Sequence, residues 1–258
     1  MRDAVVTEAG DRIRWAELAG EGPARVYLSG LGATAPAYWA GSAAHPLLAG
    51  RRSLLVDMLG FGVSDRPADF DYSLESHADA VAAALRSAGV SGAEVIGHSM
   101  GGAVAIVLAA RHPELVARLL VVDGNLDALV PTRSSAGSRG IASYAEEEFV
   151  HGGGWEAFGR LAGAHWWATI RLCGRRALYR SAVGLTRGSA PVMRELLLGL
   201  EIPRTFLWPE ENGPFQGAAE LEAAGVRMVP VADCGHNIML DNPDGFARAA
   251  RDALGVAP

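Results

Sequence analysis

Five consecutive residues in the first half of the chain combine a nucleophilic side chain with unusual backbone freedom. They are Gly97-His98-Ser99-Met100-Gly101, and the apolar residues Val95 and Ile96 precede them. A serine hydroxyl is a poor nucleophile until a base removes its proton and the backbone presents it. A sharp turn from a strand into a helix, with glycines two positions before and after the serine, provides that presentation. The segment therefore predicts a nucleophilic serine at the end of a strand.

Small residues continue after this serine. Gly102, Ala103 and Ala105 allow the following helix to pack close to the sheet. The N-terminus of such a helix directs backbone N–H groups and the positive end of its dipole towards a developing oxyanion. A G-x-S-x-G pentapeptide alone occurs by chance in many proteins, but the strand before it and the helix after it make this one specific.

This elbow and two further segments resemble the α/β-hydrolase superfamily, over almost the whole chain. Ser29-Gly30-Leu31-Gly32 follows a predicted strand, where many members carry His-Gly and then an oxyanion-hole residue. The resemblance implies that the N–H groups of Leu31 and Met100 form the oxyanion hole, with Ser29 in place of histidine. The segment 57–67 is similar to the D-x-x-G-x-G-x-S segment of the superfamily, and we expect it to have a structural role.

The resemblance also implies the general base. Members carry a Gly-His pair after the last strand, and Gly235-His236 has that placement. We expect His98, beside the serine, to pack or to form a hydrogen bond rather than to act as the base. None of the seven histidines has a second histidine or cysteine at metal-ligand spacing, so we expect no metal site. The other histidines lack the placement of a base: His45, His77, His112, His151 and His165.

Two positions compete for the carboxylate that orients the base and stabilises its positive charge. Most members of the superfamily place an aspartate after the penultimate strand, but here Glu210 and Glu211 precede a neutral Asn212. Asp123 instead ends the apolar run 119–122, and it needs a partner because an unpaired buried charge is costly. We favour Asp123 as the acid, with Glu210 and Glu211 as alternatives. The structural alternative is that Asp123 only caps the next turn.

Short apolar runs alternate with helical stretches, which predicts an α/β fold with a mostly parallel sheet and helices on both faces. The first two strands are expected to form a hairpin. Strands are predicted at residues 4–8, 12–18, 24–29, 53–57, 94–97, 116–122, 203–208 and 226–231. Helices are predicted at residues 73–88, 100–111 and 242–254, with one more between the last two strands.

Residues 125–200 break this alternation. They hold no convincing buried strand, and they are too many for a loop. We therefore expect a helical cap at 125–200, inserted into a hydrolase core formed by 1–124 and 201–258. Ligand pockets are mostly apolar, so we expect some of the cap's aromatic residues to face Ser99. These aromatic residues are Tyr144, Phe149, Trp155, Phe158, Trp166, Trp167 and Tyr179.

The composition argues against several classes of protein. The formal charge of −6 does not fit a nucleic-acid-binding protein, which needs clustered basic surface. The only two cysteines, Cys173 and Cys234, exclude a disulfide scaffold. The charged N-terminus does not resemble a signal peptide, and no apolar run is long enough to span a bilayer. We expect a soluble, cytoplasmic protein that needs no cofactor. Nothing in the sequence specifies an oligomeric state.

These features predict a serine hydrolase that cleaves an ester, either a carboxylester or a lactone, of a medium-sized hydrophobic small molecule. The reaction would pass through an acyl-enzyme on Ser99. The serine does not match haloalkane dehalogenases or epoxide hydrolases, the branches of the superfamily that use an aspartate nucleophile. Two alternatives stay open. One is a non-hydrolytic, thioester-cleaving or C–C-cleaving tailoring enzyme on the same triad, and the other is a receptor for a small molecule with a slow triad.

Overall fold

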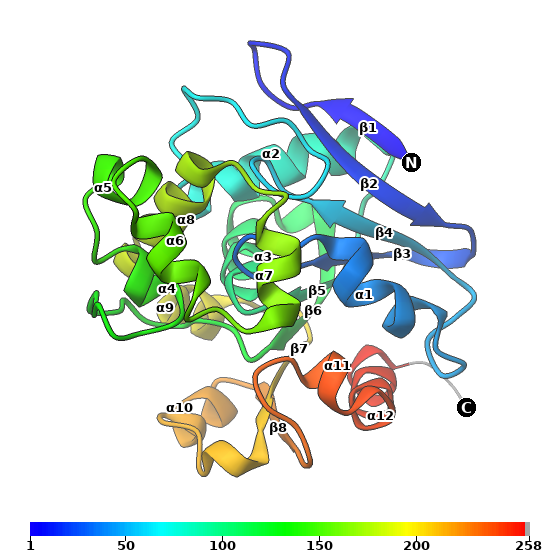
Figure 1. The fold of residues 1–258 in the computed structure, drawn as a ribbon. Helices are drawn as coiled ribbons and strands as arrows, with labels where there is room; N and C mark the ends of the chain where they lie inside the picture. The colour runs from blue at the N-terminus through cyan, green and yellow to red at the C-terminus, as the bar shows by residue number, and fades with distance from the viewer. Residues whose placement is uncertain (256–258) are drawn as a thin grey trace.

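Eight strands form one central sheet in the computed structural model, which describes residues 1–255 (Figure 1). The strands are β1 (Arg2–Val5), β2 (Arg12–Leu18), β3 (Glu21–Leu28), β4 (Arg51–Asp57), β5 (Ala93–His98), β6 (Val116–Val122), β7 (Arg204–Pro209) and β8 (Val226–Val231). Their order in the sheet is β1-β2-β4-β3-β5-β6-β7-β8. β2 pairs antiparallel with both β1 and β4, and all pairs from β4 to β8 are parallel. The mostly parallel sheet expected from the sequence is confirmed.

The first strand ends earlier than predicted. It was expected to reach residue 8, but β1 ends at Val5 and the chain turns from Val6 onwards. The Val6 N–H donates to the carbonyl of Asp11, and the Thr7 hydroxyl donates to the Asp11 carboxylate. Gly10, with φ of +94°, completes this turn. Local hydrogen bonds of Thr7 and Asp11 thus take the place of the strand pairing that was predicted for residues 6–8.

Helices cover both faces of the sheet. One face packs against α2 (Leu74–Ser87) and α3 (Met100–Arg111), and the other against α1 (Ala35–Ala44) and α12 (Pro243–Leu254). The hydroxyl of Ser73 accepts from the Ser76 N–H and caps α2. The helix α1 lies outside the predicted elements. The remaining core helices are α10 (Ala218–Ala223), α11 (Ile238–Asp241) and the 3-10 turns η1 (Pro113–Leu115) and η2 (Glu210–Asn212).

The segment between β6 and β7 is helical, and it lies to one side of the sheet (green to yellow in Figure 1). Its helices are α4 (Ser138–Ile141), α5 (Glu146–Val150), α6 (Gly154–Gly159), α7 (Ala164–Ile170), α8 (Arg175–Arg187) and α9 (Met193–Gly199). We propose that residues 125–200 form one cap, and we use that name for them below. Its last helix, α9, packs against α3 of the core.

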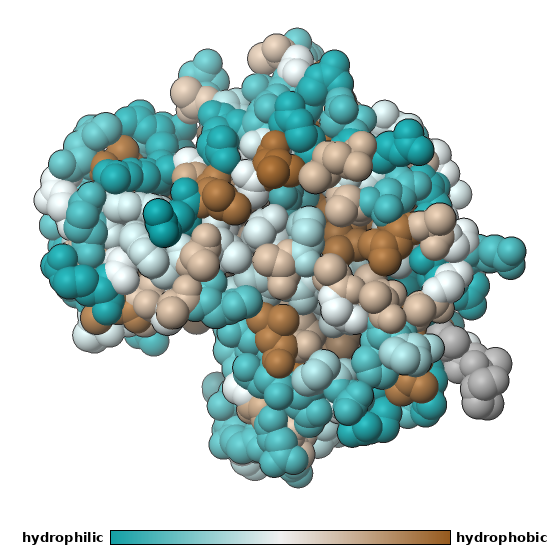
Figure 2. Space-filling model, turned by 45° about the vertical axis from the view of Figure 1, so that its right-hand side comes forward, coloured by the Kyte–Doolittle hydropathy of each residue, from teal (hydrophilic) through white to brown (hydrophobic). Residues whose placement is uncertain are grey.

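Charged residues of two cap helices, α5 and α8, pair with one another. Arg180 on α8 lies 3.1 Å from Glu146 on α5, and Arg176 lies 3.1 Å from Glu147. Figure 2 shows hydrophilic side chains around much of the edge of one face and apolar ones nearer its middle. No helix within residues 1–255 has both the length and the apolar character needed to cross a membrane.

Candidate active site

Ser99 lies at a sharp turn between β5 and α3, with φ of 53° and ψ of −122°. Non-glycine residues rarely adopt this conformation, and the surrounding structure must hold it. The Ser99 N–H donates to the carbonyl of Val122 at the end of β6. A Cβ atom at Gly97 would lie 2.3 Å from the carbonyl oxygen of Gly101, and one at Gly101 would lie 2.5 Å from that of Leu28. Both glycines are therefore required by space alone.

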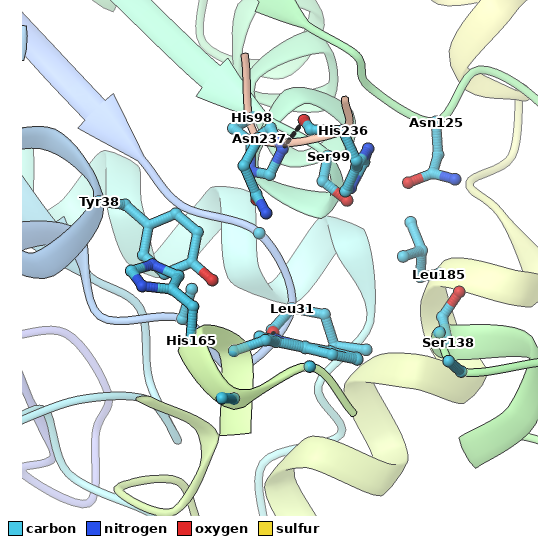
Figure 3. Close-up of a pocket in the computed structure, with 17 residues that line it drawn as sticks. Leu31, Tyr38, His98, Ser99, Asn125, Ser138, His165, Leu185, His236 and Asn237 are labelled. Carbon is cyan, nitrogen blue, oxygen red and sulfur yellow. Dashed lines mark hydrogen bonds between the residues drawn. The ribbon is translucent and has the colours of Figure 1, made fainter. Parts of the chain in front are cut away.

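His236 and Asp123 meet beside this turn. The Nδ1 atom of His236 lies 2.6 Å from the Oδ2 atom of Asp123. Asp123 directly follows β6, has φ of 43°, and donates its backbone N–H to the carbonyl of Leu207 on β7. Because the carboxylate accepts a hydrogen bond from Nδ1–H, the lone pair of the ring is on Nε2, the nitrogen available to a serine. His236 and Ser99 line the same pocket (Figure 3).

The two glutamates considered as alternatives do not reach the imidazole. The Glu211 carboxylate accepts instead from the backbone N–H of Asp233, at 2.6 Å. Glu210 is exposed, and within residues 1–255 its side chain forms no hydrogen bond. The structure thus brings Asp123, and neither glutamate, to His236.

His98 supports the loop that carries His236. Its Nε2 atom donates to the carbonyl oxygen of His236 at 2.8 Å, the bond drawn dashed in Figure 3. Burial, together with the nearby His236, lowers the pKa of His98 well below its ordinary value, so this ring is neutral. The same loop is tied by the Asp241 carboxylate, which accepts from the Gly235 N–H. Hydrogen bonding by His98 agrees with the expectation from the sequence.

The segment predicted to supply the oxyanion hole forms a tight turn against the serine. We call this turn, residues 30–33, the oxyanion turn. The Ala33 N–H donates to the carbonyl of Gly30, and Gly32 has φ of +67°. A Cβ atom at Gly30 would lie 3.1 Å from that of Ser99. Within residues 1–255 the N–H of Leu31 has no acceptor, and first-turn helical amides such as that of Met100 have none within their helix. These two amides remain our proposed oxyanion donors.

The D-x-x-G-x-G-x-S segment, residues 57–67, binds the residues that directly follow the oxyanion turn. The buried carboxylate of Asp57 accepts from the backbone N–H groups of Ala35 and Val63 and from the hydroxyl of Thr34. A Cβ atom at Gly62 would lie 1.9 Å from an Asp57 carboxylate oxygen. The contacts of Asp57 therefore fix the start of α1, directly after the oxyanion turn, which is a structural role.

The pocket above Ser99 has a volume of about 500 Å³. Tyr38 and His165 lie on one side of Ser99, and Asn125, Leu185 and Ser138 lie on the other (Figure 3). Burial raises the pKa of Tyr38, so its hydroxyl is a neutral hydrogen-bond donor. None of the lining residues is an arginine, an aspartate or a glutamate.

The sequence did not predict which polar residues line this pocket. Asn125 and Asn237 closely follow Asp123 and His236 in the chain, and that proximity was the available signal. Of the seven aromatic residues expected in the cap, only Trp166 lines the pocket. Several of the others pack against one another inside the cap, such as Phe149, which meets Trp155 edge-on.

Neither cysteine offers a second nucleophile. Burial, followed by nearby acidic groups, raises the pKa of Cys234 to about 11, and burial also raises the pKa of Cys173. Within residues 1–255 no group of three or more His, Cys, Asp or Glu side chains is arranged to hold a metal ion.

A family model described as the alpha/beta hydrolase fold matches residues 26–136, which include the oxyanion turn and the serine elbow. Solved structures of that fold superpose on nearly the whole chain. An esterase from Exiguobacterium antarcticum does so with a TM-score of 0.78 and 18% identity, covering 97% of this chain and 98% of that one. The chain has the α/β-hydrolase fold. The resemblance expected from the sequence is thereby confirmed.

The chain is similar to enzymes with different substrates. An enol-lactonase from Burkholderia xenovorans LB400 superposes with a TM-score of 0.74 and 21% identity, covering 98% of this chain and 100% of that one. A 2-hydroxymuconate semialdehyde hydrolase from a Pseudomonas species is 42% identical over 98 residues, 38% of this chain and 34% of that protein. The match thus spans about a third of that curated relative's length.

Proposed function

We propose that this protein is a serine hydrolase that cleaves a carboxylester or lactone of an uncharged, medium-sized small molecule. The observation that carries the proposal is the 2.6 Å contact between Asp123 and His236 beside the pocket that Ser99 lines. In the proposed reaction Ser99 is the nucleophile, His236 the general base and Asp123 the acid that orients it. We also propose a cytoplasmic location and a small molecule, rather than a nucleic acid, as the partner.

The proposed reaction has two halves. In the first, the Nε2 atom of His236 takes the proton of Ser99 as its oxygen attacks the carbonyl carbon. The amides of Leu31 and Met100 stabilise the oxyanion, and His236 protonates the departing alcohol. In the second, His236 deprotonates a water molecule, which attacks the acyl-enzyme, and His236 then returns the proton to the oxygen of Ser99 as the acid is released. One such amide contributes about 3 kcal/mol to lowering the barrier.

The walls of the pocket favour an uncharged substrate. Tyr38, Asn125, Ser138 and Asn237 offer neutral hydrogen-bonding groups, and Leu185 adds apolar surface. A carboxylate-bearing substrate would find no arginine among the lining residues, and the chain contains no lysine. Burying an unpaired carboxylate is costly, so such a substrate should bind less well than its neutral ester.

A second candidate is suggested by the 42% identical relative, whose name specifies a semialdehyde rather than an ester. The same three residues support hydrolysis of a thioester or of a carbon–carbon bond next to a carbonyl group.

The test is a kinetic panel of esters, lactones, thioesters and ketones with a hydrolysable carbon–carbon bond, each in a neutral and a carboxylate-bearing form, with Ser99→Ala beside the wild type. We expect multiple turnovers of neutral esters by the wild type and none by Ser99→Ala. Multiple turnover of carbon–carbon substrates alone would favour the second candidate. Tight binding of an apolar ligand without turnover of any compound would contradict both and support a receptor.

A further inference from the structure

Three successive carbonyl groups of the oxyanion turn accept hydrogen bonds, one from the turn itself and two from the cap. The carbonyl of Gly30 accepts from Ala33 within the turn. The carbonyl of Leu31 accepts from the indole Nε1–H of Trp166, at 2.8 Å. The carbonyl of Gly32 accepts from the thiol of Cys173, at 3.0 Å. The first bond lies within the core, whereas the other two come from the cap.

The cap also packs directly on the turn. A Cβ atom at Gly32 would lie 2.6 Å from Leu178 and 2.8 Å from Ile170, so the cap leaves room only for glycine. Trp166 is half-buried on α7, and its ring meets Phe158 edge-on, with the centroids 5.2 Å apart. The indole N–H is therefore a fixed donor, oriented by the packing of its ring.

The bond from Trp166 acts on the most easily rotated part of this turn. Gly32 has a positive φ at the third position, as in a type II turn, and the peptide between Leu31 and Gly32 is the central one. Rotation of that peptide exchanges type II for type I geometry and turns the Leu31 carbonyl to the opposite side. The two backbone angles that change are ψ of Leu31 and φ of Gly32, so the rotation alters the shape of the whole turn. The indole opposes this rotation, because rotation would break its hydrogen bond.

We propose that Trp166 is a positioning residue that makes the oxyanion hole depend on the seating of the cap. With the cap in place, Trp166 fixes the Leu31–Gly32 peptide and so holds the shape and position of the turn that presents the Leu31 N–H to the oxyanion. When the cap is displaced, the carbonyl groups of the turn lose the bonds from Trp166 and Cys173 and keep only the internal bond from Ala33. This inference rests on the proposed hydrolase function and adds a role for the cap in it.

The sharpest test removes only the indole N–H. Trp166 is replaced by 3-benzothienylalanine, in which sulfur takes the place of the N–H group, and by phenylalanine. Trp167→Phe is the matched control. Trp167 lies on the same helix and is also half-buried, but it packs against Trp155 with tilted rings and donates no hydrogen bond to residues 1–255. Each variant is assayed for kcat, KM and melting temperature with the best ester of the wild type.

Binding of two ligands separates positioning from packing. A trifluoromethyl ketone forms a tetrahedral adduct with a serine and requires the oxyanion hole, whereas the unreactive alcohol of the same shape does not. We expect both Trp166 variants to lose about tenfold in kcat and a similar factor in affinity for the ketone. For the benzothienyl variant, which keeps the shape of the ring, affinity for the alcohol, KM and the melting temperature should stay close to those of Trp167→Phe.

Three results would overturn the inference. One is a benzothienyl variant with wild-type kcat and ketone affinity. Another is a rise in KM at unchanged kcat, which would make Trp166 a substrate contact. The third is an equal loss in Trp167→Phe, which would indicate general packing. A wild-type protein that turns over no ester would instead fail the proposed function, and the role of Trp166 would fall with it.

Discussion

The Nδ1 atom of His236 lies 2.6 Å from the Oδ2 atom of Asp123, although 113 residues separate the two in the chain. Asp123 reaches this position from the end of β6, next to the strand that carries Ser99. The carboxylate is mostly buried, and the imidazole is about half exposed, with side-chain exposures of 19% and 54%. Asp123 is therefore held by the sheet, whereas His236 lies on a loop.

We predict that Asp123→Asn lowers kcat by about 10⁴, because an amide neither favours the required tautomer of His236 nor stabilises its positive charge. Steady-state kinetics with the best ester checks this. Glu210→Gln and Glu211→Gln are the matched controls and should change kcat little. The reverse ranking would assign the acid to the loop after β7.

We predict that His98→Phe lowers kcat about tenfold, because the carbonyl of His236 loses its buried donor and the loop is less well fixed. His98→Gln, which retains an N–H donor, should recover most of this loss. The measurement is kcat for both variants alongside their melting temperatures. Equal activity of the phenylalanine and glutamine variants would show that the hydrogen bond has no such role.

We predict that Gly101→Ala abolishes activity and lowers stability by several kcal/mol, because the new Cβ atom would lie 2.5 Å from the carbonyl of Leu28. Gly41→Ala is the control. Gly41 is exposed within α1 and a Cβ atom there would meet nothing within 4 Å, so this change should stabilise the fold by about 0.5–1 kcal/mol. Urea unfolding measures both. A Gly101→Ala protein of normal stability would contradict the packing that the structure describes.

We predict that the protein loses stability as the pH falls below 6.5, in part through His77. Burial lowers the pKa of this histidine to about 3, while the unfolded chain takes up its proton near pH 6.5. Its contribution is therefore fully present above pH 6.5 and is lost as the pH falls towards 3. It should cost about 2 kcal/mol of unfolding free energy between pH 6.5 and pH 5. The lowered pKa of His98 acts in the same direction.

Urea unfolding at pH 7 and pH 5 tests the contribution of His77. His77→Gln removes the titrating group and can still bond to Ser181, which now lies 3.1 Å from the Nε2 atom of His77. The variant should show a smaller loss of stability between the two pH values than the wild type. Equal losses would mean that His77 is not the group responsible.

The sequence was sufficient for the parts of the fold that follow periodic patterns. Strands β6 and β8 and helix α3 have the predicted bounds, because their apolar runs end at polar residues or at proline. The elbow was predictable for a different reason. Gly97 and Gly101 are required by contacts with residues nearby in the chain and with the end of β3. The spacing of these glycines therefore indicates the sharp turn without knowledge of the rest of the fold.

Other features depended on contacts that no local pattern records. Helix α1 is built from small residues around Tyr38 and Trp39 and has little periodicity, so neither the helix nor the place of Tyr38 in the pocket was predicted. The bond from Trp166 to Leu31 joins residues 135 positions apart. Aromatic residues suggested an apolar cap, but only packing could decide which of them reaches the pocket.

The adjacency of β5 and β6 has a consequence for how this protein can change over evolutionary time. Ser99 and Asp123 each follow a strand directly, and His98 pairs with Val122 in the register of those two strands. Substitutions in the helices that alter the twist of the sheet would therefore carry both residues along together. The outer layers can diverge extensively while the spacing of these two residues is inherited unchanged, and only the loop of His236 must adjust to them.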